Sequence, residues 1–505
     1  MTVPLVPGAP DTISSNTEWN QLCWFSIEKN VYRLQMRIAK AVRNKQYGKV
    51  KSLQWLLAHS VSAKLLAVRR VTTAKGSKTP GIDGVVWSTP EEKYTATRSL
   101  KVRGYRAQPL RRIYIPKKNG KQRPLSIPTM HDRAMQALYL LALDPISETT
   151  ADLNSYGFRP KRSTHDAILQ CYITLAGRNS AQWILEGDIK ACFDEIDHEW
   201  LKSNVMMDKR VLTQWLQAGY IDKNQRFETV RGTPQGGPAS PLLANLVLDG
   251  LEKEIHTGCK QGDKVNYIRF ADDFVVTAKS PEILKEKVIP IIVNFLAQRG
   301  LSLSQEKTKI VHIEEGFDFL GFNVRKYKGK YLSKPSKNSI KAIRKKIKET
   351  VKKGYGWSGA ELISILNPII KGWANYYRIG VSKATYSALD NYIYQKTFNW
   401  TMRKFHGHKR YKAVYRYFRS RSISRRWIFS DVVKTKEGKK NVCICKMMDI
   451  KIQRHVKIRS AANPYLPEYS EYFEERNKWA QKRSFTQWII DKRLNVIGSE
   501  LLLGE

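Results

Sequence analysis

Two apolar segments that carry aspartates at their ends constrain this chain most strongly. The run WILEGD ends in Asp188, and the run YIRFADDFVV carries Asp272 and Asp273 between two apolar halves. These patterns predict a β-strand for the first run and a β-hairpin with an acidic tip for the second. If the two elements lie side by side in one core, the three carboxylates come together. Like charges at that distance are unfavourable unless cations neutralise them.

A carboxylate cluster of this kind suits hard divalent cations. Mg²⁺ prefers oxygen ligands and is commonly held by one or two carboxylates together with substrate phosphates. Two such ions, about 4 Å apart, form the clamp used for in-line phosphoryl transfer. We therefore expect two Mg²⁺ ions at Asp188, Asp272 and Asp273. Adjacent aspartates are also common in loops, so the cluster alone fits two unrelated acidic turns as well.

Basic and glycine-rich segments elsewhere in the chain favour a nucleotide site. The stretch LRRIYIPKKNGKQRPLSIP predicts two short strands joined by an Asn119-Gly120 turn. Its cations suit triphosphate oxygens, although they also fit a solvated basic hairpin. The segment TPQGGPASPLL places Gln235 ahead of a helix start, where backbone N–H groups can approach a nucleotide. The order of these features resembles that of a template-directed polymerase with a right-hand shape.

The net charge indicates the partner. The chain has 88 Lys and Arg against 45 Asp and Glu, a formal charge of +43. A protein this basic is expected to bind a polyanion, so we expect nucleic acid rather than membrane. The longest apolar run, Val288 to Ala297, is about half the ~20 residues that span a bilayer. The N-terminus lacks a signal-peptide pattern and the six cysteines are scattered, which predicts reduced thiols and a cytoplasmic, nucleoid-associated protein.

Composition divides the chain into four predicted domains. Residues 1–74 are helical by pattern, residues 75–325 are mixed α/β, and residues 326–426 are helical again. The stretch 325–426 holds 27 Lys and Arg against 3 Asp and Glu. Residues 427–505 form a basic tail. Within the mixed region, GPASPLLANLVLDGLEKEI predicts one continuous helix.

Seven motifs occur in an order that resembles the reverse-transcriptase domain of group II intron-encoded proteins of the bacterial type. They are IPKKNGKQRPLSIP, LNSYGFRPKRSTHDAI, LEGDIKACFDEIDH, RGTPQGGPASPLLANLVLDGLE, YIRFADDFVV, LSLSQEKTKI and GFDFLGF. TPGIDGV is similar to the N-terminal block of that family, GWANYYR (372–378) to its maturase, or X, domain, and residues 455–477 to the segment that follows. The resemblance covers about residues 20–480.

The resemblance implies the fold and the identity of the four regions. It implies an α+β right-hand polymerase whose fingers and palm carry an antiparallel sheet, with a helical N-terminal extension and a helical thumb/maturase domain. Residues 75–325 would be the fingers and palm, and residues 326–426 the thumb and the RNA-binding maturase domain. Residues 427–505 would be a DNA-binding-like tail.

The resemblance also implies roles for individual residues. Asp188, Asp272 and Asp273 match the catalytic, metal-binding carboxylates. Phe193 matches a steric gate, whose ring would clash with a 2′-hydroxyl and favour dNTPs, although it also fits a core aromatic. The residues that match the nucleotide site are Arg111, Lys117, Arg123, Phe193, Gln235 and Lys307. The residues that match the primer grip are Phe319, Leu320 and Gly321.

The basic helical region 325–426 is predicted to bind RNA. Its helices carry cations that suit a phosphate backbone and aromatics that suit unpaired bases. Each aromatic also fits a hydrophobic core. The cations are Lys341, Arg344, Lys345, Lys348, Lys352, Lys353, Arg378, Arg403 and Lys404, and the aromatics are Trp373, Tyr376, Tyr377, Trp400 and Tyr411.

The tail predicts no HNH endonuclease. A zinc-supported HNH domain needs two cysteine pairs, and no His or Cys follows His455. We therefore expect no cleavage of a second DNA strand, and a nick from another source would supply the primer.

The resemblance implies an RNA-directed DNA polymerase that copies intron RNA into cDNA at a DNA insertion site, and a maturase that assists splicing and reverse splicing. Its partners would be a group II intron RNA, target DNA and dNTPs. Alternatives are a maturase without polymerase activity, which the intact triad disfavours, and a domesticated or defence-associated reverse transcriptase, which GWANYYR disfavours. An RNA-templated RNA polymerase is disfavoured by Phe193.

Overall fold

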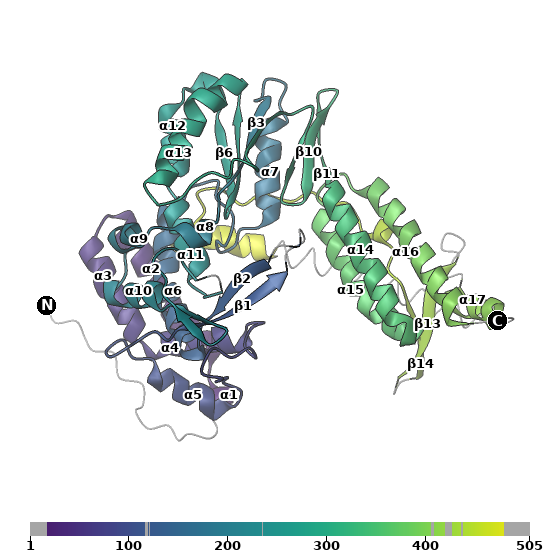
Figure 1. The fold of residues 1–505 in the computed structure, drawn as a ribbon, viewed down its shortest axis with the longest axis horizontal. Coiled ribbons are helices and arrows are strands. Elements are labelled where there is room, and N and C mark those ends of the chain that lie inside the picture. Colours follow the sequence, from purple (N-terminus) through teal and green to yellow (C-terminus); the bar gives the residue numbers. More distant parts are fainter. Residues whose placement is uncertain are drawn as a thin grey trace.

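The structure is a computed structural model that describes residues 18–116, 120, 122–234, 236–405, 409–419, 427–435 and 438–478. Figure 1 shows two lobes. The first contains the elements up to β8, and the second contains α14–α17 with the strands that follow them. A sheet of three strands, β9–β11, lies between the lobes.

The N-terminal region is helical and packs around one buried helix. The amphipathic pattern of residues 18–73 is confirmed as helix, because its apolar faces cover α6 (Met130–Thr150), which is buried along most of its length. The N-terminal helices that cover it are α2 (Trp24–Arg43), α3 (Tyr47–His59) and α4 (Val61–Thr73). Helix α5 (Pro90–Ser99) packs on α4, and α1 (Glu18–Gln21) packs on α5.

A basic hairpin extends from this helical base. Strands β1 (Leu110–Pro116) and β2 (Gln122–Ile127) pair antiparallel, with Pro116 opposite Gln122, so the predicted hairpin is confirmed. Strand β4 (Tyr220–Asp222) runs parallel to β1, and β5 (Gln225–Phe227) completes a sheet of order β2-β1-β4-β5.

The central sheet is antiparallel and covered on both faces. Its order is β6-β7-β3-β8, for strands β3 (Trp183–Asp188), β6 (Asn266–Phe270), β7 (Asp273–Ala278) and β8 (Lys309–His312). Alternate side chains enter different cores: Leu185 and Phe274 join the core of the first lobe, whereas Ile184 and Val275 join the core continuous with the second lobe. Helices α7 (Thr164–Leu175), α12 (Leu251–Gly258) and α13 (Ile289–Ala297) pack beside the sheet (Figure 1).

The helices around the sheet include one correction. The segment predicted as a single helix forms two, α11 (Ser240–Leu248) and α12, because Gly250 adopts a left-handed conformation at φ 98°. The break leaves Asp249 free to turn towards the sheet. The remaining short elements are α8 (Cys192–Glu195), α9 (His198–Asn204), α10 (Lys209–Gln217), a 3₁₀ turn Gln261–Asp263 and a π-helical turn Ile283–Val288.

The second lobe is a helical layer backed by a small sheet. The connecting sheet has strands β9 (Phe317–Phe319), β10 (Phe322–Tyr327) and β11 (Lys330–Pro335). The helices are α14 (Lys337–Lys353), α15 (Gly359–Tyr377), α16 (Lys383–Lys404) and α17 (Lys409–Tyr417), and 3₁₀ turns occur at Gly354–Gly356, Met447–Asp449 and Pro467–Tyr469. The small sheet has strands β12 (Phe418–Arg419), β13 (Ile428–Thr435) and β14 (Gly438–Cys443).

The predicted domain boundary between residues 426 and 427 falls inside a sheet of the second lobe. Strand β12 pairs with β13, so one sheet crosses this boundary. The hairpin β13–β14 also packs on α15, where Asn367 Nδ2 donates to the carbonyl of Cys443 at 2.9 Å. Residues up to 443 therefore belong with the helices of the second lobe.

The chain then returns to the first lobe as a strap, which we define as residues 451–478 (yellow in Figure 1). His455 Nε2 donates to the buried carboxylate of Asp166 at 2.8 Å, and Tyr32 donates to the carbonyl of Pro464 at 2.7 Å. Arg162, buried in the first lobe, donates to two strap carbonyls. The strap thus joins the two ends of the molecule. Among the described residues, no helix is long and apolar enough to cross a membrane.

Candidate active site

The structure brings the three predicted carboxylates to one end of the central sheet. Asp188, the last residue of β3, lies directly opposite Asp273, the first residue of β7. Phe270 pairs with Asp273, so Asp272 stands in the two-residue turn between β6 and β7. Directly opposite residues on antiparallel strands have Cβ atoms about 5 Å apart. The hairpin with an acidic tip is therefore confirmed as a structure, and the catalytic role of its residues stays a prediction.

Crowding of the carboxylates changes their protonation. Asp273 is exposed to solvent as a whole residue, but the protein atoms around its carboxylate reduce the hydration of that group. This desolvation, with the nearby charges of Asp272 and Asp188, raises the pKa of Asp273 to about 6. Lys307 opposes the effect, because its ammonium lies 2.8 Å from Asp188 Oδ2. That hydrogen bond raises the pKa of Lys307.

The donor set fits a hard divalent cation only in part. All three side chains offer carboxylate oxygens, and their mutual repulsion is what a cation would relieve. Within the described part of the chain, however, no group of three or more His, Cys, Asp or Glu side chains is arranged to hold a metal ion. An ion at this site would therefore need further oxygen ligands from water or substrate, which is the usual situation for Mg²⁺.

The acidic tip is positioned by a close backbone contact that sequence reasoning missed. Ala271 has a left-handed φ of 59°, and a Cβ atom added to Gly157 would lie 2.3 Å from Ala271 N. Only glycine permits this approach. The carbonyl of Gly157 also accepts a hydrogen bond from Asn245 Nδ2 at 2.8 Å. Gly157 lies inside the motif LNSYGFRPKRS, which marked the segment but not this contact.

A buried ion pair anchors the strand that leads to the tip. Arg269 on β6 is fully buried and pairs with Asp249 at the break between α11 and α12. It also donates to Asn245 Oδ1 at 3.1 Å. A charged residue inside the apolar run YIRF, together with an aspartate inside the apolar run NLVLDGL, was the sequence signal for this pair.

The predicted gate lies beside the glycine-rich loop. Phe193 is half-buried on α8, and its carbonyl accepts a hydrogen bond from Thr233 N at 2.6 Å. The loop continues to Gly236, where an added Cβ would lie 2.5 Å from the carbonyl of Ser126 on β2. A cavity of about 380 Å³ opens here, lined by Phe193, Thr233, Ser126 and Arg112 among others. Gln235 lies outside the described residues.

The hairpin cations lie on one face of the sheet. Arg111 pairs with Ile127, and Arg123 pairs with Ile115, which places both arginines on the same face of the β1–β2 hairpin. The buried Nε of Arg111 has no hydrogen-bond partner among the described residues. Lys117 lies outside the described residues.

The predicted primer grip is a strained two-residue turn. Leu320 and Gly321 have φ values of 49° and 81°, and they join Phe319 to its pairing partner Phe322. A left-handed leucine costs about 1–3 kcal/mol and persists only where the surroundings hold it.

The surroundings of this turn come from the second lobe. Tyr376 donates from its hydroxyl to the carbonyl of Leu320 at 2.8 Å. Tyr377 donates to Ser339 Oγ at 2.7 Å, and Ser339 in turn donates to the carbonyl of Gly321 at 3.2 Å. These contacts were not predicted, because the two tyrosines belong to GWANYYR, which the sequence associated with RNA.

Two of the predicted RNA-stacking aromatics are buried, as the alternative of a hydrophobic core expected. Tyr377 is 5% exposed and Trp400 is fully buried, with its Nε1 donating to the carbonyl of Gly354 at 2.7 Å. Tyr376 and Trp373 are half-buried, and Trp373 packs against Tyr377 with ring centroids 4.4 Å apart. Tyr411, by contrast, is 73% exposed. Most of these aromatics therefore form the core between helices.

The predicted RNA-binding cations divide into exposed and engaged groups. Helix α14 buries Ile343, Ile347 and Val351 and turns its cations to solvent. The predicted cations that are exposed on this helix are Lys341, Arg344, Lys345, Lys348, Lys352 and Lys353, and Lys337 and Lys346 are exposed beside them. Lys404 is engaged instead, because its ammonium donates to the carbonyl of Trp357, and Arg378 is half-buried. Arg403 donates to the hydroxyl of Tyr355 at 2.9 Å.

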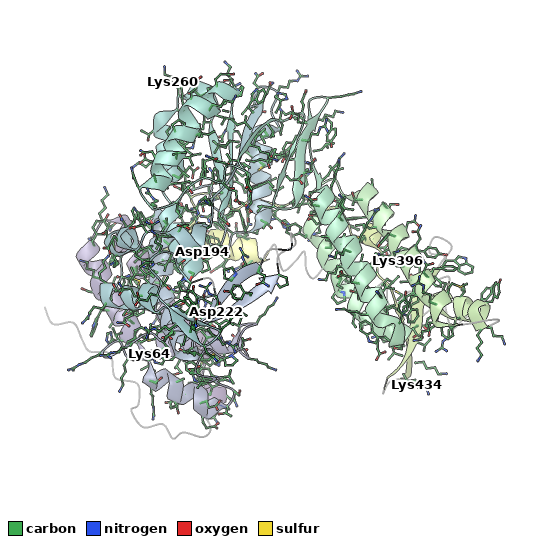
Figure 2. All side chains as sticks on the ribbon, in the orientation of Figure 1. Lys64, Asp194, Asp222, Lys260, Lys396 and Lys434 are labelled. Carbon is green, nitrogen blue, oxygen red and sulfur yellow. The ribbon has the colours of Figure 1, made fainter. Side chains whose placement is uncertain are left out.

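Cationic side chains are not confined to the second lobe. Figure 2 shows Lys64 and Lys260 on the first lobe and Lys396 and Lys434 on the second. Neutralising one face alone would therefore leave a large positive charge on the other.

Three known families match consecutive parts of the chain. Residues 19–100 match the N-terminal domain of reverse transcriptase, and residues 115–324 match reverse transcriptase (RNA-dependent DNA polymerase). Residues 340–418 match the maturase-specific domain of group II introns. The middle match contains the central sheet, and the last contains most of α14 and all of α15 to α17.

Individual relatives agree with this assignment. Protein YkfC of Escherichia coli is 34% identical over 310 residues, which cover 52% of this chain and 81% of YkfC. The group II intron-encoded protein LtrA of Lactococcus lactis is 31% identical over 412 residues, which cover 62% of this chain and 68% of LtrA. A solved telomerase from Candida albicans, in complex with a fragment of telomeric RNA, covers 61% of this chain and 64% of its own at 12% identity. Its TM-score of 0.36 is too low to support an inference.

These matches agree with the motif order and with the antiparallel sheet that carries the acidic tip. The chain carries a reverse-transcriptase domain followed by a maturase domain. It belongs to the family of group II intron reverse transcriptases/maturases.

Proposed function

We propose that this protein copies a group II intron RNA into cDNA at a DNA insertion site, and that it binds the same RNA to assist splicing and reverse splicing. The observation that carries the proposal is the placement of Asp188 opposite Asp273, beside the Asp272 turn, in a chain that also has a maturase domain. The first feature supports polymerisation and the second supports intron RNA as the template.

The three carboxylates are the proposed ligands of two Mg²⁺ ions. Bound there, the ions would activate the primer 3′-hydroxyl and stabilise charge on the transferred phosphoryl group. Asp273, with a pKa of about 6, is mostly ionised at pH 7, and Lys307 helps to keep the cluster charged. Lys307 is proposed to release Asp188 when other cations approach, since its own side chain is largely exposed.

The nucleotide is proposed to bind between the hairpin and the gate. Arg111 and Arg123 share a face of the hairpin, and their guanidinium groups can meet triphosphate oxygens there. Lys117 and Gln235 complete the proposed set from their sequence positions. Phe193 is proposed to exclude a 2′-hydroxyl, since it lines the cavity next to the glycine-rich loop.

The intron RNA is proposed to bind the exposed face of α14. A helix that buries three aliphatic side chains and exposes eight cations can follow a phosphate backbone. Target DNA is the proposed third partner.

The test separates polymerisation from RNA binding. The variant Asp272→Ala/Asp273→Ala is compared with wild type in primer extension on an RNA template with Mg²⁺ and dNTPs, and in splicing of a group II intron RNA. We expect cDNA synthesis to disappear while RNA affinity and splicing assistance stay near wild type. The control is Glu282→Ala/Glu286→Ala, which removes two exposed carboxylates far from the sheet end. Loss of both activities in the aspartate variant would contradict the proposal and show a structural role.

A further inference from the structure

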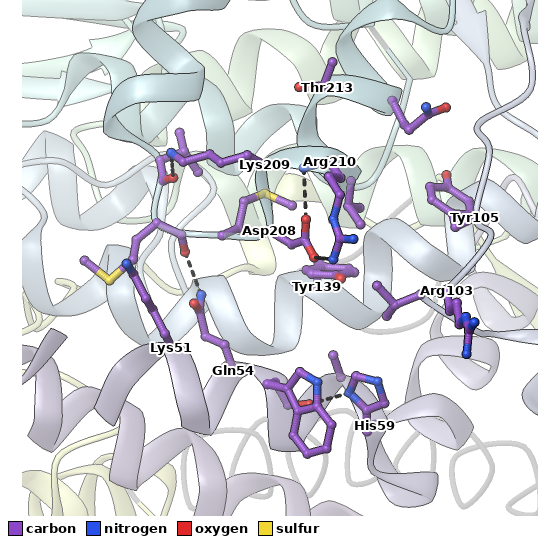
Figure 3. Close-up of a pocket in the computed structure, with 18 of the residues that line it drawn as sticks. Lys51, Gln54, His59, Arg103, Tyr105, Tyr139, Asp208, Lys209, Arg210 and Thr213 are labelled. Carbon is purple, nitrogen blue, oxygen red and sulfur yellow. Dashed lines mark hydrogen bonds and ion pairs between the residues drawn. The ribbon is translucent and has the colours of Figure 1, made fainter. Parts of the chain in front are cut away.

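A large open pocket lies in the first lobe away from the carboxylates. It has a volume of about 1230 Å³ and is bounded by α3, the segment 102–106 and the connection between α9 and α10 (Figure 3). None of the residues predicted for catalysis, nucleotide binding or primer binding lines it. The proposed function therefore leaves this pocket unexplained.

The lining of the pocket is strongly basic. Asp208 is its single carboxylate, and it caps α10 by accepting from Arg210 N at 2.9 Å. Among the described residues, Lys51, Arg103 and Arg106 have no ion-pair partner. Burial lowers the pKa of Lys209, and the charge of Lys51 lowers it further. Such an uncompensated cation cluster suits an anionic ligand with several charges.

An exposed aromatic pair lines the same pocket. The ring of Trp55 on α3 is 63% exposed, and it stacks on His59 with centroids 4.2 Å apart and planes inclined at 26°. His59 Nδ1 donates to the carbonyl of Trp55 at 2.8 Å, which fixes the imidazole and leaves Nε2 free. One face of the indole thus remains uncovered in a fixed orientation. A flat apolar group can stack there without reorganising the site.

Hydrogen bonds hold the walls of the pocket together. Gln54 Nε2 donates to the carbonyl of Met206 at 2.7 Å and ties α3 to the α9–α10 connection. Lys209 Nζ donates to the carbonyl of Val205 at 2.9 Å. Tyr105 in the floor donates to Asp132 at 2.7 Å. The cations and the indole are therefore presented on a preformed surface, which lowers the cost of binding.

We propose that this pocket binds an unpaired nucleotide of single-stranded RNA. The base stacks on Trp55, and the adjoining phosphates contact Lys51, Arg103 and Arg106. Anionic charge and a flat apolar face occur together in a nucleotide, which is why the pocket favours it over an acidic peptide. Bases inside a duplex cannot reach the ring, so the ligand is a loop or an unpaired strand. The proposal rests on RNA being the partner, as in the proposed function, and assigns a second contact remote from the acidic tip.

The test uses the full chain and a defined probe, a 12-nucleotide oligouridine that carries one 5-iodouridine. The polymerase cleft is first occupied by a primer–template duplex in excess. Affinity is measured by fluorescence anisotropy, and contacts are mapped by irradiation and mass spectrometry. We expect a crosslink in the peptide that contains Trp55. Trp55→Ala should weaken binding about ten-fold, a typical loss for removal of a stacking aromatic.

Matched variants keep the test falsifiable. Phe25→Ala removes a ring that is 75% exposed on α2 and should leave affinity unchanged, whereas Trp55→Phe should retain most of it. Equal affinity of Trp55→Ala and wild type would overturn the proposal, as would equal competition by a duplex RNA. Displacement of the probe by oligoglutamate but not by unlabelled oligouridine would also overturn it, in favour of a protein partner. Primer extension by wild type reports on the proposed function separately, so the two failures are distinguishable.

Discussion

Replacing Tyr376 by Phe tests whether the second lobe positions the primer-grip turn. The substitution removes only the hydroxyl that donates to the carbonyl of Leu320 at 2.8 Å. A hydrogen bond of this kind contributes about 0.5–1.5 kcal/mol net. The lost hydrogen bond holds Leu320, whose left-handed backbone conformation already costs about 1–3 kcal/mol. The turn should therefore leave its present conformation more often, by roughly five-fold for each 1 kcal/mol lost.

The assay is steady-state primer extension with the primer–template concentration varied. For Tyr376→Phe we expect a KM for primer–template about five-fold above wild type, with kcat at saturation changed less than two-fold. Thermal unfolding should show a small decrease in Tm. The control is Tyr392→Phe on α16, whose hydroxyl donates to the carbonyl of Arg344 far from the turn.

A second substitution distinguishes positioning from general destabilisation. Leu320→Gly removes the cost of the left-handed conformation, so adding it to Tyr376→Phe should restore much of the lost affinity. A KM for Tyr376→Phe within two-fold of wild type, or equal to that of Tyr392→Phe, would refute the reasoning. So would a double variant whose KM is no lower than that of Tyr376→Phe alone.

Three further predictions test other parts of the structure. Gly157→Ala should reduce cDNA synthesis at least ten-fold and lower the Tm, because its Cβ would displace the backbone of Ala271. Gly177→Ala, where the nearest atom is 3.9 Å away, is the control, and full activity of Gly157→Ala would contradict the contact. Asp166→Asn should lower stability: burial raises the pKa of Asp166, but the hydrogen bond from His455 and others outweigh it and hold the pKa at about 2. The depressed pKa corresponds to a stabilisation of roughly 2 kcal/mol above pH 4, and this stabilisation is lost as the pH falls towards 2. The Tm values of variant and wild type should therefore converge in acid. A difference in Tm that stays constant with pH would show that the charge of Asp166 does not stabilise the fold. Replacing three exposed lysines of α14 by Gln should lower the log–log salt slope of RNA affinity by about two to three, and an unchanged slope would show that this face does not contact phosphate.

Local patterns in the sequence predict the central part of the site because the information is local. The run YIRFADDFVV contains both strands of the hairpin and its tip, and the alternation of core sides within β3 and β7 follows from strand period alone. The pairing of Asp188 with Asp273 needed only the further assumption that two apolar strands are neighbours. The basic hairpin was predictable for the same reason, since its turn lies within a few residues of both strands.

The remaining features depend on partners that are distant in sequence. Asp166 meets His455 across 289 residues, and no periodicity in either segment encodes that contact. The helix break at Gly250 was missed because the apolar pattern continues through it. The break is explained by a distant residue, since Asp249 forms an ion pair with the buried Arg269. The burial of Trp400 and Tyr377 could not be predicted, because a tyrosine or tryptophan among cations has the same local pattern in a core and on an RNA-binding face.

The position of GWANYYR changes how variants of this motif should be interpreted. Tyr376 donates a hydrogen bond to the turn proposed to grip the primer, and Tyr377 is linked to the same turn through Ser339. The strap reaches the last residue of the motif, because Gln453 N donates to the carbonyl of Arg378 at 2.9 Å. A substitution here can therefore impair cDNA synthesis without touching RNA, and a splicing defect need not mean a lost RNA contact. The exposed cations of α14 lie on the outer face of the same lobe and make few such bonds. If α14 variants lose splicing assistance but keep a normal KM for primer–template, RNA binding is located on that face. If variants of the two tyrosines raise the KM for primer–template but keep normal splicing, the tyrosines link the second lobe to the primer-grip turn.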